Sequence, residues 1–147
     1  MIVYPSTDYN SWVSVSDAQT YLSTRLHADE WDALSSDAER EVALQTAFRS
    51  LNGLDLNISC DADFVISSTA YTALEQEKLL TALKQAQCEQ ALHELKFDVD
   101  DQAVKHVALG GMLSLTLNPN EKPPRHSERA LAILRPYLRV RTVARFR

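Results

Sequence analysis

Residues 71–97 read Y-T-A-L-E-Q-E-K-L-L-T-A-L-K-Q-A-Q-C-E-Q-A-L-H-E-L-K-F, and the rest of the chain is expected to pack around them. The stretch contains neither Gly nor Pro, and most of its residues are strong helix formers. Its apolar side chains recur at near-helical spacing: Leu80, Leu83, Cys88, Ala91, Leu92 and Leu95. The polar side chains fall on the other side: Glu75, Lys78, Gln85, Glu89, His93 and Lys96. The sequence therefore predicts one long central helix with an apolar stripe that other helices cover.

Length and composition predict a single small domain. The chain has 147 residues, of which 45% are hydrophobic, and this is enough for a real core. No apolar run approaches the ~18 residues needed to span a bilayer, so no membrane partner is expected. The first five residues, M-I-V-Y-P, lack the basic and apolar regions of a signal peptide. Cys60 and Cys88 lie far apart and suit a reducing compartment.

The charge is distributed unevenly along the chain. The net charge is −5, but residues 1–121 carry 19 acidic and 7 basic side chains, whereas residues 122–147 carry 1 acidic and 8 basic side chains. This asymmetry predicts an acidic body with a basic arm that meets an acidic partner. The partner is either nucleic acid or the acidic surface of a protein, including another copy of this chain.

Two capping patterns place helices before the central one. Ser16 with Gln19 forms a capping-box pattern and predicts a helix over residues 17–26, after an extended lead-in over residues 1–14. Residues 27–34 add one short helical turn with Trp31 and Leu34 facing inward.

A second capping box, Ser36 with Glu39, predicts a helix over residues 37–52. Its predicted apolar face consists of Leu44, Ala47, Phe48 and Leu51. Asn52-Gly53 is expected to end it, with Gly53 in the left-handed conformation that glycine adopts at little cost.

After the central helix, the spacing of the apolar residues changes from a helical period to a period of two. Residues 104–117 alternate around Gly110-Gly111, which predicts a β-hairpin with a two-residue turn. Residues 119–126 are a Pro-rich linker, and Ser127 is expected to cap a last helix that Pro136 stops. The predicted organisation is a helical body with a hairpin over residues 1–118, the linker, and a C-terminal helix with a basic arm over residues 127–147. The predicted fold class is mainly α: a small helical bundle around one long helix, with a β-hairpin and an extended C-terminal arm.

The chain carries no pattern typical of an enzyme or of a cofactor or metal site. The cysteines and histidines have neither C-x-x-C nor H-x-x-x-H spacing, so a core thiol and surface imidazoles are the simplest interpretation. The acidic runs at 61–63 and 98–101 lack the glycine and glutamate of a calcium loop. With three glycines in the chain, neither a nucleophile elbow nor a phosphate-binding loop is formed. We therefore expect a protein that is not an enzyme.

The basic C-terminal arm is the candidate site. Its residues alternate between arginines and apolar side chains, which suits addition of a strand to a partner's sheet while the arginines pair with the partner's acids. Two alternatives remain open: the arm binds along the phosphate backbone of a nucleic acid, or it is a solvated tail. The partner-binding residues predicted on this basis are Arg129, Arg135, Tyr137, Leu138, Arg139, Arg141, Val143, Arg145, Phe146 and Arg147.

Several segments, in order, resemble the head–tail connector (adaptor) proteins of tailed phages. Residues 15–18 with Tyr21, Arg25 and Trp31, followed by Arg40, Ala43-Leu44 and Leu51, resemble the N-terminal half of that family. The segments that resemble its central helix, hairpin and C-terminal segment are K-Q-A-Q-C-E-Q-A-L at 84–92, V-A-L-G-G-M-L-S-L-T-L at 107–117, R-A-L at 129–131 and L-R-P-Y-L at 134–138. Residues 54–70 depart from the family's pattern.

The resemblance implies a structural protein of the virion neck, assembled in the host cytoplasm. It implies a ring of about twelve copies between the portal protein and a tail or stopper protein, closed by a heterologous contact. Genomic DNA would pass through the lumen without tight binding, and the C-terminal arm would engage the portal. Some relatives are described as DnaT-like single-stranded-DNA-binding proteins, which makes DNA binding by the basic arm the alternative function. A helical interaction module unrelated to phages also remains open.

Overall fold

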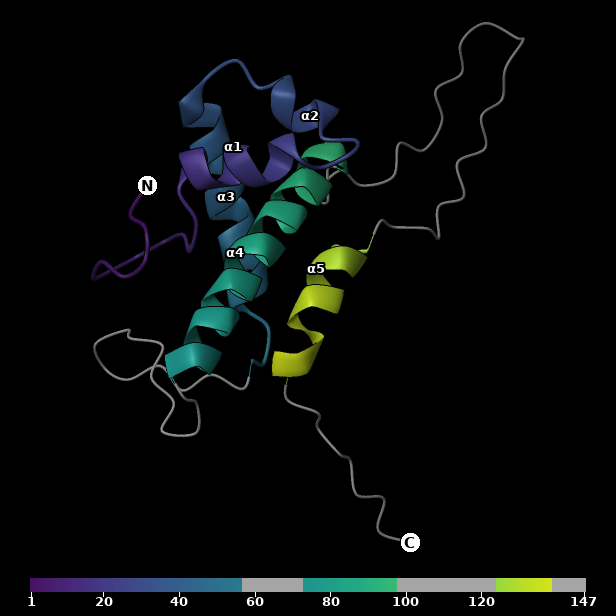
Figure 1. Ribbon diagram of the computed structural model, residues 1–147. Coiled ribbons are helices and arrows are strands. Elements are labelled where there is room, and N and C mark those ends of the chain that lie inside the picture. Colours follow the sequence, from purple (N-terminus) through teal and green to yellow (C-terminus); the bar gives the residue numbers. More distant parts are fainter. Residues whose placement is uncertain (57–72, 98–123, 139–147) are drawn as a thin grey trace, which may run out of the picture.

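A computed structural model of the chain is drawn in Figure 1, and it describes residues 1–56, 73–97 and 124–138. The described part is mainly helical and contains no strand element. Its helices, in chain order, are α1 (Val15–Ser23), α2 (Asp29–Asp32), α3 (Asp37–Asn52), α4 (Ala73–Lys96), α5 (Glu128–Leu134) and the 3₁₀ turn η1 (Arg135–Tyr137).

Helix α4 is the central element, as predicted. It has 24 residues and spans about 36 Å at ~1.5 Å per residue. Helices α1, α2, α3 and α5 all pack against it, and Figure 1 shows α5 running alongside it. Because neighbours cover α4 on several sides, residues 86–92 are all buried, including Gln87, Glu89 and Gln90. The prediction of a wet face that includes Glu89 is therefore wrong.

Helices α2 and α3 follow the sequence pattern closely. The side chain of Ser36 accepts a hydrogen bond from the Glu39 backbone, and the Glu39 carboxylate accepts one from Ser36 N, so the predicted capping box is confirmed. The Glu39 carboxylate also accepts hydrogen bonds from the backbone N and the hydroxyl of Ser35. These Ser35 bonds, more than the bond from Ser36, lower the pKa of Glu39. The Trp31 side chain is fully buried.

Two details of the helix ends differ from the prediction. Ser14, not Ser16, caps α1, because the Ser14 hydroxyl accepts from Asp17 N at 3.1 Å. The helix ends at Ser23 instead of residue 26. Gly53 follows α3 with φ −78°, which is right-handed, so the left-handed end that we expected is wrong.

The N-terminal segment folds back on itself instead of remaining extended. Tyr4 N donates to Ser11 O and Asn10 N donates to Ile2 O, both at 2.9 Å. This turn brings the Tyr4 and Tyr9 rings edge to face at 5.3 Å, and Tyr9 also packs against Phe48. The segment thereby covers one end of α3.

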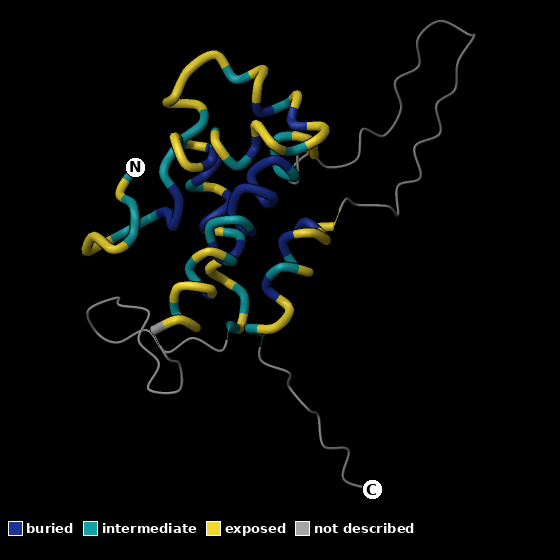
Figure 2. Tube along the Cα trace, viewed as in Figure 1, coloured by how far each residue is buried: buried dark blue, intermediate teal, exposed yellow. Residues whose placement is uncertain are grey.

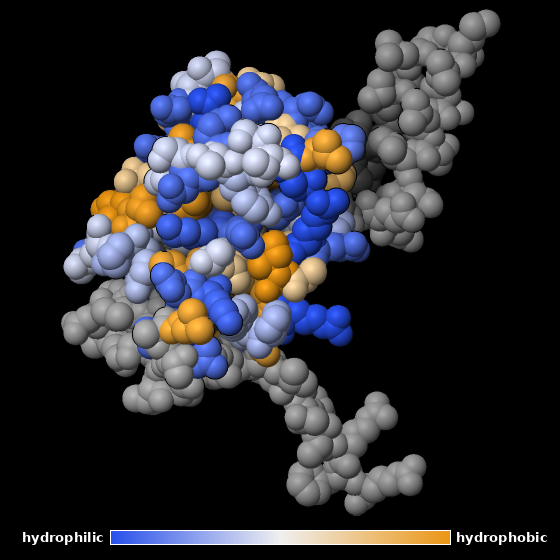
Figure 3. Space-filling view, viewed as in Figure 1, coloured by the Kyte–Doolittle hydropathy of each residue, from blue (hydrophilic) through white to orange (hydrophobic). Residues whose placement is uncertain are grey.

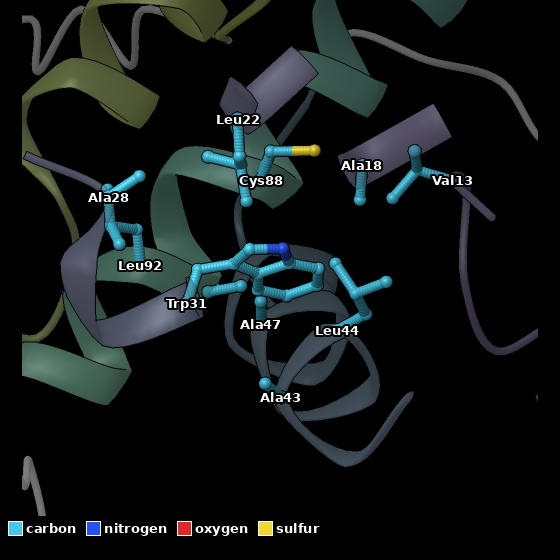
Figure 4. Close-up of a cluster of buried hydrophobic side chains, with 11 residues drawn as sticks. Val13, Ala18, Leu22, Ala28, Trp31, Ala43, Leu44, Ala47, Cys88 and Leu92 are labelled. Carbon is cyan, nitrogen blue, oxygen red and sulfur yellow. The ribbon is translucent and has the colours of Figure 1, made fainter. Parts of the chain in front are cut away.

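The buried side chains form two clusters along α4, and Figure 2 shows the buried positions running through its middle. The first surrounds Trp31, as Figure 4 shows, and receives Leu22 from α1, Leu44 from α3 and Leu92 from α4. Trp31 Nε1 donates to Gln19 Oε1 at 2.8 Å, so the indole keeps a polar partner while its rings are buried. The second cluster joins Phe48 and Leu83 to α5.

Some of the predicted features lie outside the described residues. They are the β-hairpin over residues 104–117, most of the Pro-rich linker over residues 119–126, and the arm from residue 139 to the end.

Candidate protein-interaction site

The structure places only four of the ten predicted partner-binding residues. Arg129 on α5 and Arg135 in η1 are exposed, whereas Tyr137 and Leu138 are half-buried. The other six lie outside the described residues: Arg139, Arg141, Val143, Arg145, Phe146 and Arg147.

The start of the predicted C-terminal segment belongs to the folded body. Ala130 and Leu134 of α5 are fully buried in the second cluster, and Tyr137 packs against the same cluster. Leu138 then forms an antiparallel β-bridge with Leu56, just after α3. Residues 127–138 are therefore part of the body, although Arg129 and Arg135 keep exposed side chains.

Gln90 fixes the position at which the C-terminal segment joins α4. Its side chain is fully buried, its Oε1 accepts from Ser127 N at 2.8 Å, and its Nε2 donates to Arg125 O at 3.1 Å and to Glu94 Oε1 at 2.8 Å. One turn later, His93 Nε2 lies 2.7 Å from Pro124 O. Ser127 also caps α5 through its hydroxyl. These polar contacts set the register of α5 on α4, which apolar packing alone leaves loosely specified.

Gln87 does the same for the N-terminal half. Its Oε1 accepts from Trp12 N at 2.9 Å, and its Nε2 donates to Ser11 Oγ and to Leu44 O, both at 2.8 Å. A single buried amide therefore joins α4 to the N-terminal segment and to α3. All its polar atoms are satisfied, as a buried amide requires.

Glu89 is the third buried polar side chain on α4, and it binds α1. It is 5% exposed, and its two oxygens accept from Arg25 Nε at 2.8 Å and Nη2 at 3.2 Å. Tyr21 Oη also donates to Glu89, at 3.1 Å. Burial raises the pKa of Tyr21 to about 12, with a further contribution from the Glu89 charge. The hydrogen bond to Glu89 raises the pKa of Arg25.

Two side chains near the C-terminal end of α4 retain unused hydrogen-bonding capacity. His126 Nδ1 is buried without a partner among the described residues, and desolvation, followed by the nearby Arg125 charge, lowers the pKa of this imidazole. Glu94 Oε2 is likewise buried without a partner, although Glu94 Oε1 accepts from Ser50 Oγ at 2.6 Å.

Two surface cavities flank this end of α4. One, of about 450 Å³, lies between α3 and α4 and is lined mainly by small or apolar side chains with Glu39 and Glu94 among them. The other, of about 410 Å³, is lined by Arg25, Lys96 and Arg129 among others. On the face that Figure 3 shows, hydrophobic side chains stand singly or in small groups among hydrophilic ones.

The described residues carry no group of three or more side chains suited to hold a metal ion. The Cys88 thiol is buried in the first cluster, and burial raises its pKa to about 12, which agrees with the predicted core thiol. Within the described ranges, no helix is long and apolar enough to cross a membrane.

Sequence reasoning missed the three polar side chains that connect α4 to its neighbours, Gln87, Glu89 and Gln90. The signal that was available is the segment 85–90, Q-A-Q-C-E-Q, where Gln87 and Gln90 fall on or beside the stripe that contains Leu83 and Cys88. Comparisons of the chain with protein-family models, with curated proteins and with solved structures gave no match.

Proposed function

We propose that this protein is a structural adaptor of a tailed-phage neck, which forms a ring between the portal and the tail or stopper proteins. The observation that carries the proposal is the charge segregation along the chain. Residues 1–56 hold 9 acidic and 3 basic side chains, whereas residues 139–147 hold 4 arginines and no acid. An acidic body with a short basic end suits contact with another protein better than tight binding of DNA.

One structural observation bears on the separate role of the C-terminal arm in this proposal. Leu138 belongs to the body, because its bridge to Leu56 holds it against the folded part. The nine residues beyond it are long enough to reach ~30 Å when extended. In the proposal these residues engage acidic side chains of the portal, with alternate positions available for strand addition to a sheet edge.

In the proposed assembly, the helical elements of each copy form a small bundle, and about twelve copies close into a ring by a heterologous contact. The ring lumen extends the DNA channel, and its acidic lining lets genomic DNA pass without capture. The protein is then a virion component that is present in the host cytoplasm during assembly.

Binding to the portal protein encoded in the same genome tests the proposal. We expect the full-length chain to co-purify with portal, and a chain that ends at Leu138 to be folded but to lose the interaction. Reversal of Arg139 and Arg141 to Glu should weaken binding, whereas reversal of the exposed Arg49 on α3 is the matched control and should not. Portal binding that survives the truncation would show that the arm assignment is wrong.

The alternative function is single-stranded-DNA binding by the same arm, and its arginines together with Phe146 favour it. A DNA-binding protein retains oligonucleotides at physiological salt and loses them steeply as salt rises. The adaptor proposal predicts weak retention throughout the salt series.

A further inference from the structure

We propose that the cavity between α3 and α4 receives the loop around Leu26 of a second copy, and that this pair of surfaces forms the head-to-tail contact of the ring. The inference rests on the proposed adaptor function, because it names the contact that would close the ring. It uses described residues alone and does not involve residues 139–147.

The receiving surface is an apolar cavity with acidic side chains. Ala38, Ala43 and Ala91 line it with short side chains, and Val42 stands at it with 63% of its surface exposed. Glu39 and Glu94 line the same cavity, and Glu94 Oε2 has no hydrogen-bond partner among the described residues. The cavity therefore suits an apolar side chain flanked by cations.

The loop between α1 and α2 offers such a side chain. Leu26 is 78% exposed, the highest value among the exposed large hydrophobic residues of the described part. Its neighbours Arg25 and His27 line the second cavity together with Lys96 and Arg129. The same cavity also holds Glu89, which is paired with Arg25, and Glu128, so Leu26 stands beside a surface with a small net positive charge. Phe97, 39% exposed, adds further apolar area there.

The loop is held in place before any partner arrives. His27 has φ 62°, a left-handed conformation that is uncommon for a residue other than glycine. Such a residue persists when its surroundings fix the backbone, and it is found most often at functional sites. Here the buried Glu89 binds the Arg25 guanidinium, and Arg25 in turn donates to Leu26 O. An exposed leucine on a fixed loop loses little entropy when it docks.

The two surfaces lie on different sides of α4. The α4 residues of the acidic cavity are Ala91, Glu94 and Leu95, and those of the basic one are Glu89, Leu92, His93 and Lys96. At ~100° per residue the two sets point about 150° apart around the helix axis. Different surfaces on one copy make a heterologous contact, which is the kind that generates rings. Opposite charges on the two surfaces favour this pairing over pairing of like surfaces.

Two single variants test the contact, each at an exposed position where folding should be unaffected. Val42→Lys places a long charged side chain where Leu26 would dock, and Leu26→Glu places a carboxylate against the acidic cavity. Sedimentation velocity over a concentration series should show that each variant stays monomeric where the wild-type chain associates. The matched control is Leu74→Glu, at a 60% exposed leucine near the other end of α4, which should assemble like the wild type.

An equimolar mixture of the two variants gives the sharpest result. Each mixed pair retains one intact contact, formed by the cavity of the Leu26→Glu chain and the loop of the Val42→Lys chain. The mixture should therefore associate at least to dimers, which neither variant forms alone.

Wild-type chains that stay monomeric to about 1 mM, variants that assemble normally, or a mixture that stays monomeric would each overturn the contact. These outcomes are independent of portal binding, because no portal is present in the assay. A ring that forms in either single variant leaves the adaptor proposal standing and rejects this contact alone. Loss of portal binding with assembly intact leaves this contact standing and rejects the adaptor proposal.

Discussion

Replacement of Gln90 by Leu should detach the C-terminal segment from the body. The amide makes three hydrogen bonds, to Ser127 N, Arg125 O and Glu94 Oε1, and the Ser127 bond is buried. Each such bond contributes about 1 kcal/mol net, and a buried donor left without a partner costs about as much again or more. Burial of the apolar leucine side chain offsets part of this loss of stability. The expected loss is therefore about 3 kcal/mol in the free energy of unfolding.

Urea denaturation and amide hydrogen exchange together measure this effect. A loss of about 3 kcal/mol lowers the urea midpoint by roughly 1.5 M for a slope of about 2 kcal/mol/M. The exchange protection of residues 127–134 should fall more than that of α3, because the lost bonds hold α5. Gln85→Leu is the matched control on the same helix, at a half-buried position, and should change stability by less than about 0.5 kcal/mol.

The role of the polar contacts of α4 is refuted if Gln90→Leu is as stable as Gln85→Leu. It is also refuted if α5 keeps its exchange protection while the rest of the protein is destabilised. In either case the apolar packing of Ala130 and Leu134 would hold α5 on its own.

Three further predictions concern the buried groups. Glu89→Gln leaves the Arg25 guanidinium without its carboxylate and should lower the free energy of unfolding in denaturant by about 3 kcal/mol. Arg25→Met added to that variant should recover part of the loss. A wild-type unfolding midpoint for Glu89→Gln would contradict the role of the pair. Because the folded-state pKa of His126 lies below its ordinary value of 6.5, this imidazole contributes stability above pH 6.5 that is lost as the pH falls through the folded pKa, so stability should fall less steeply below pH 6.5 in His126→Gln than in the wild type. In a Cys60→Ser background, Cys88 should react with a thiol reagent only at the rate of unfolding, and rapid labelling of the native protein would contradict its burial.

The elements that the sequence predicted well are those whose signals are local. The capping box at Ser36 and Glu39 gave the start of α3, and the uninterrupted helical period gave α4 to within two residues. The cap of α1 was misplaced because Ser14 and Ser16 both precede the helix, and the S-x-x-D pattern of Ser14 and Asp17 was the one that formed.

The connections made by Gln87, Glu89 and Gln90 could not be predicted in the same way. Their partners lie 35 to 76 residues away in sequence, except for Glu94, so the sequence around each residue does not identify its partner. A hydropathy period assigns such side chains to the wet face, whereas a helix covered on several sides buries them and satisfies them with hydrogen bonds from distant segments. For the candidate site, the residues up to Leu138 proved to be part of the body, and the predicted role of residues 139–147 stays a prediction.

Electron cryomicroscopy of the portal with this chain bound tests the central claim most directly. The account predicts a ring of about twelve copies, with residues 139–147 of each copy lying against acidic side chains of the portal. A ring in which these nine residues lie on the chain's own helices, or a portal that carries no ring at all, would contradict it.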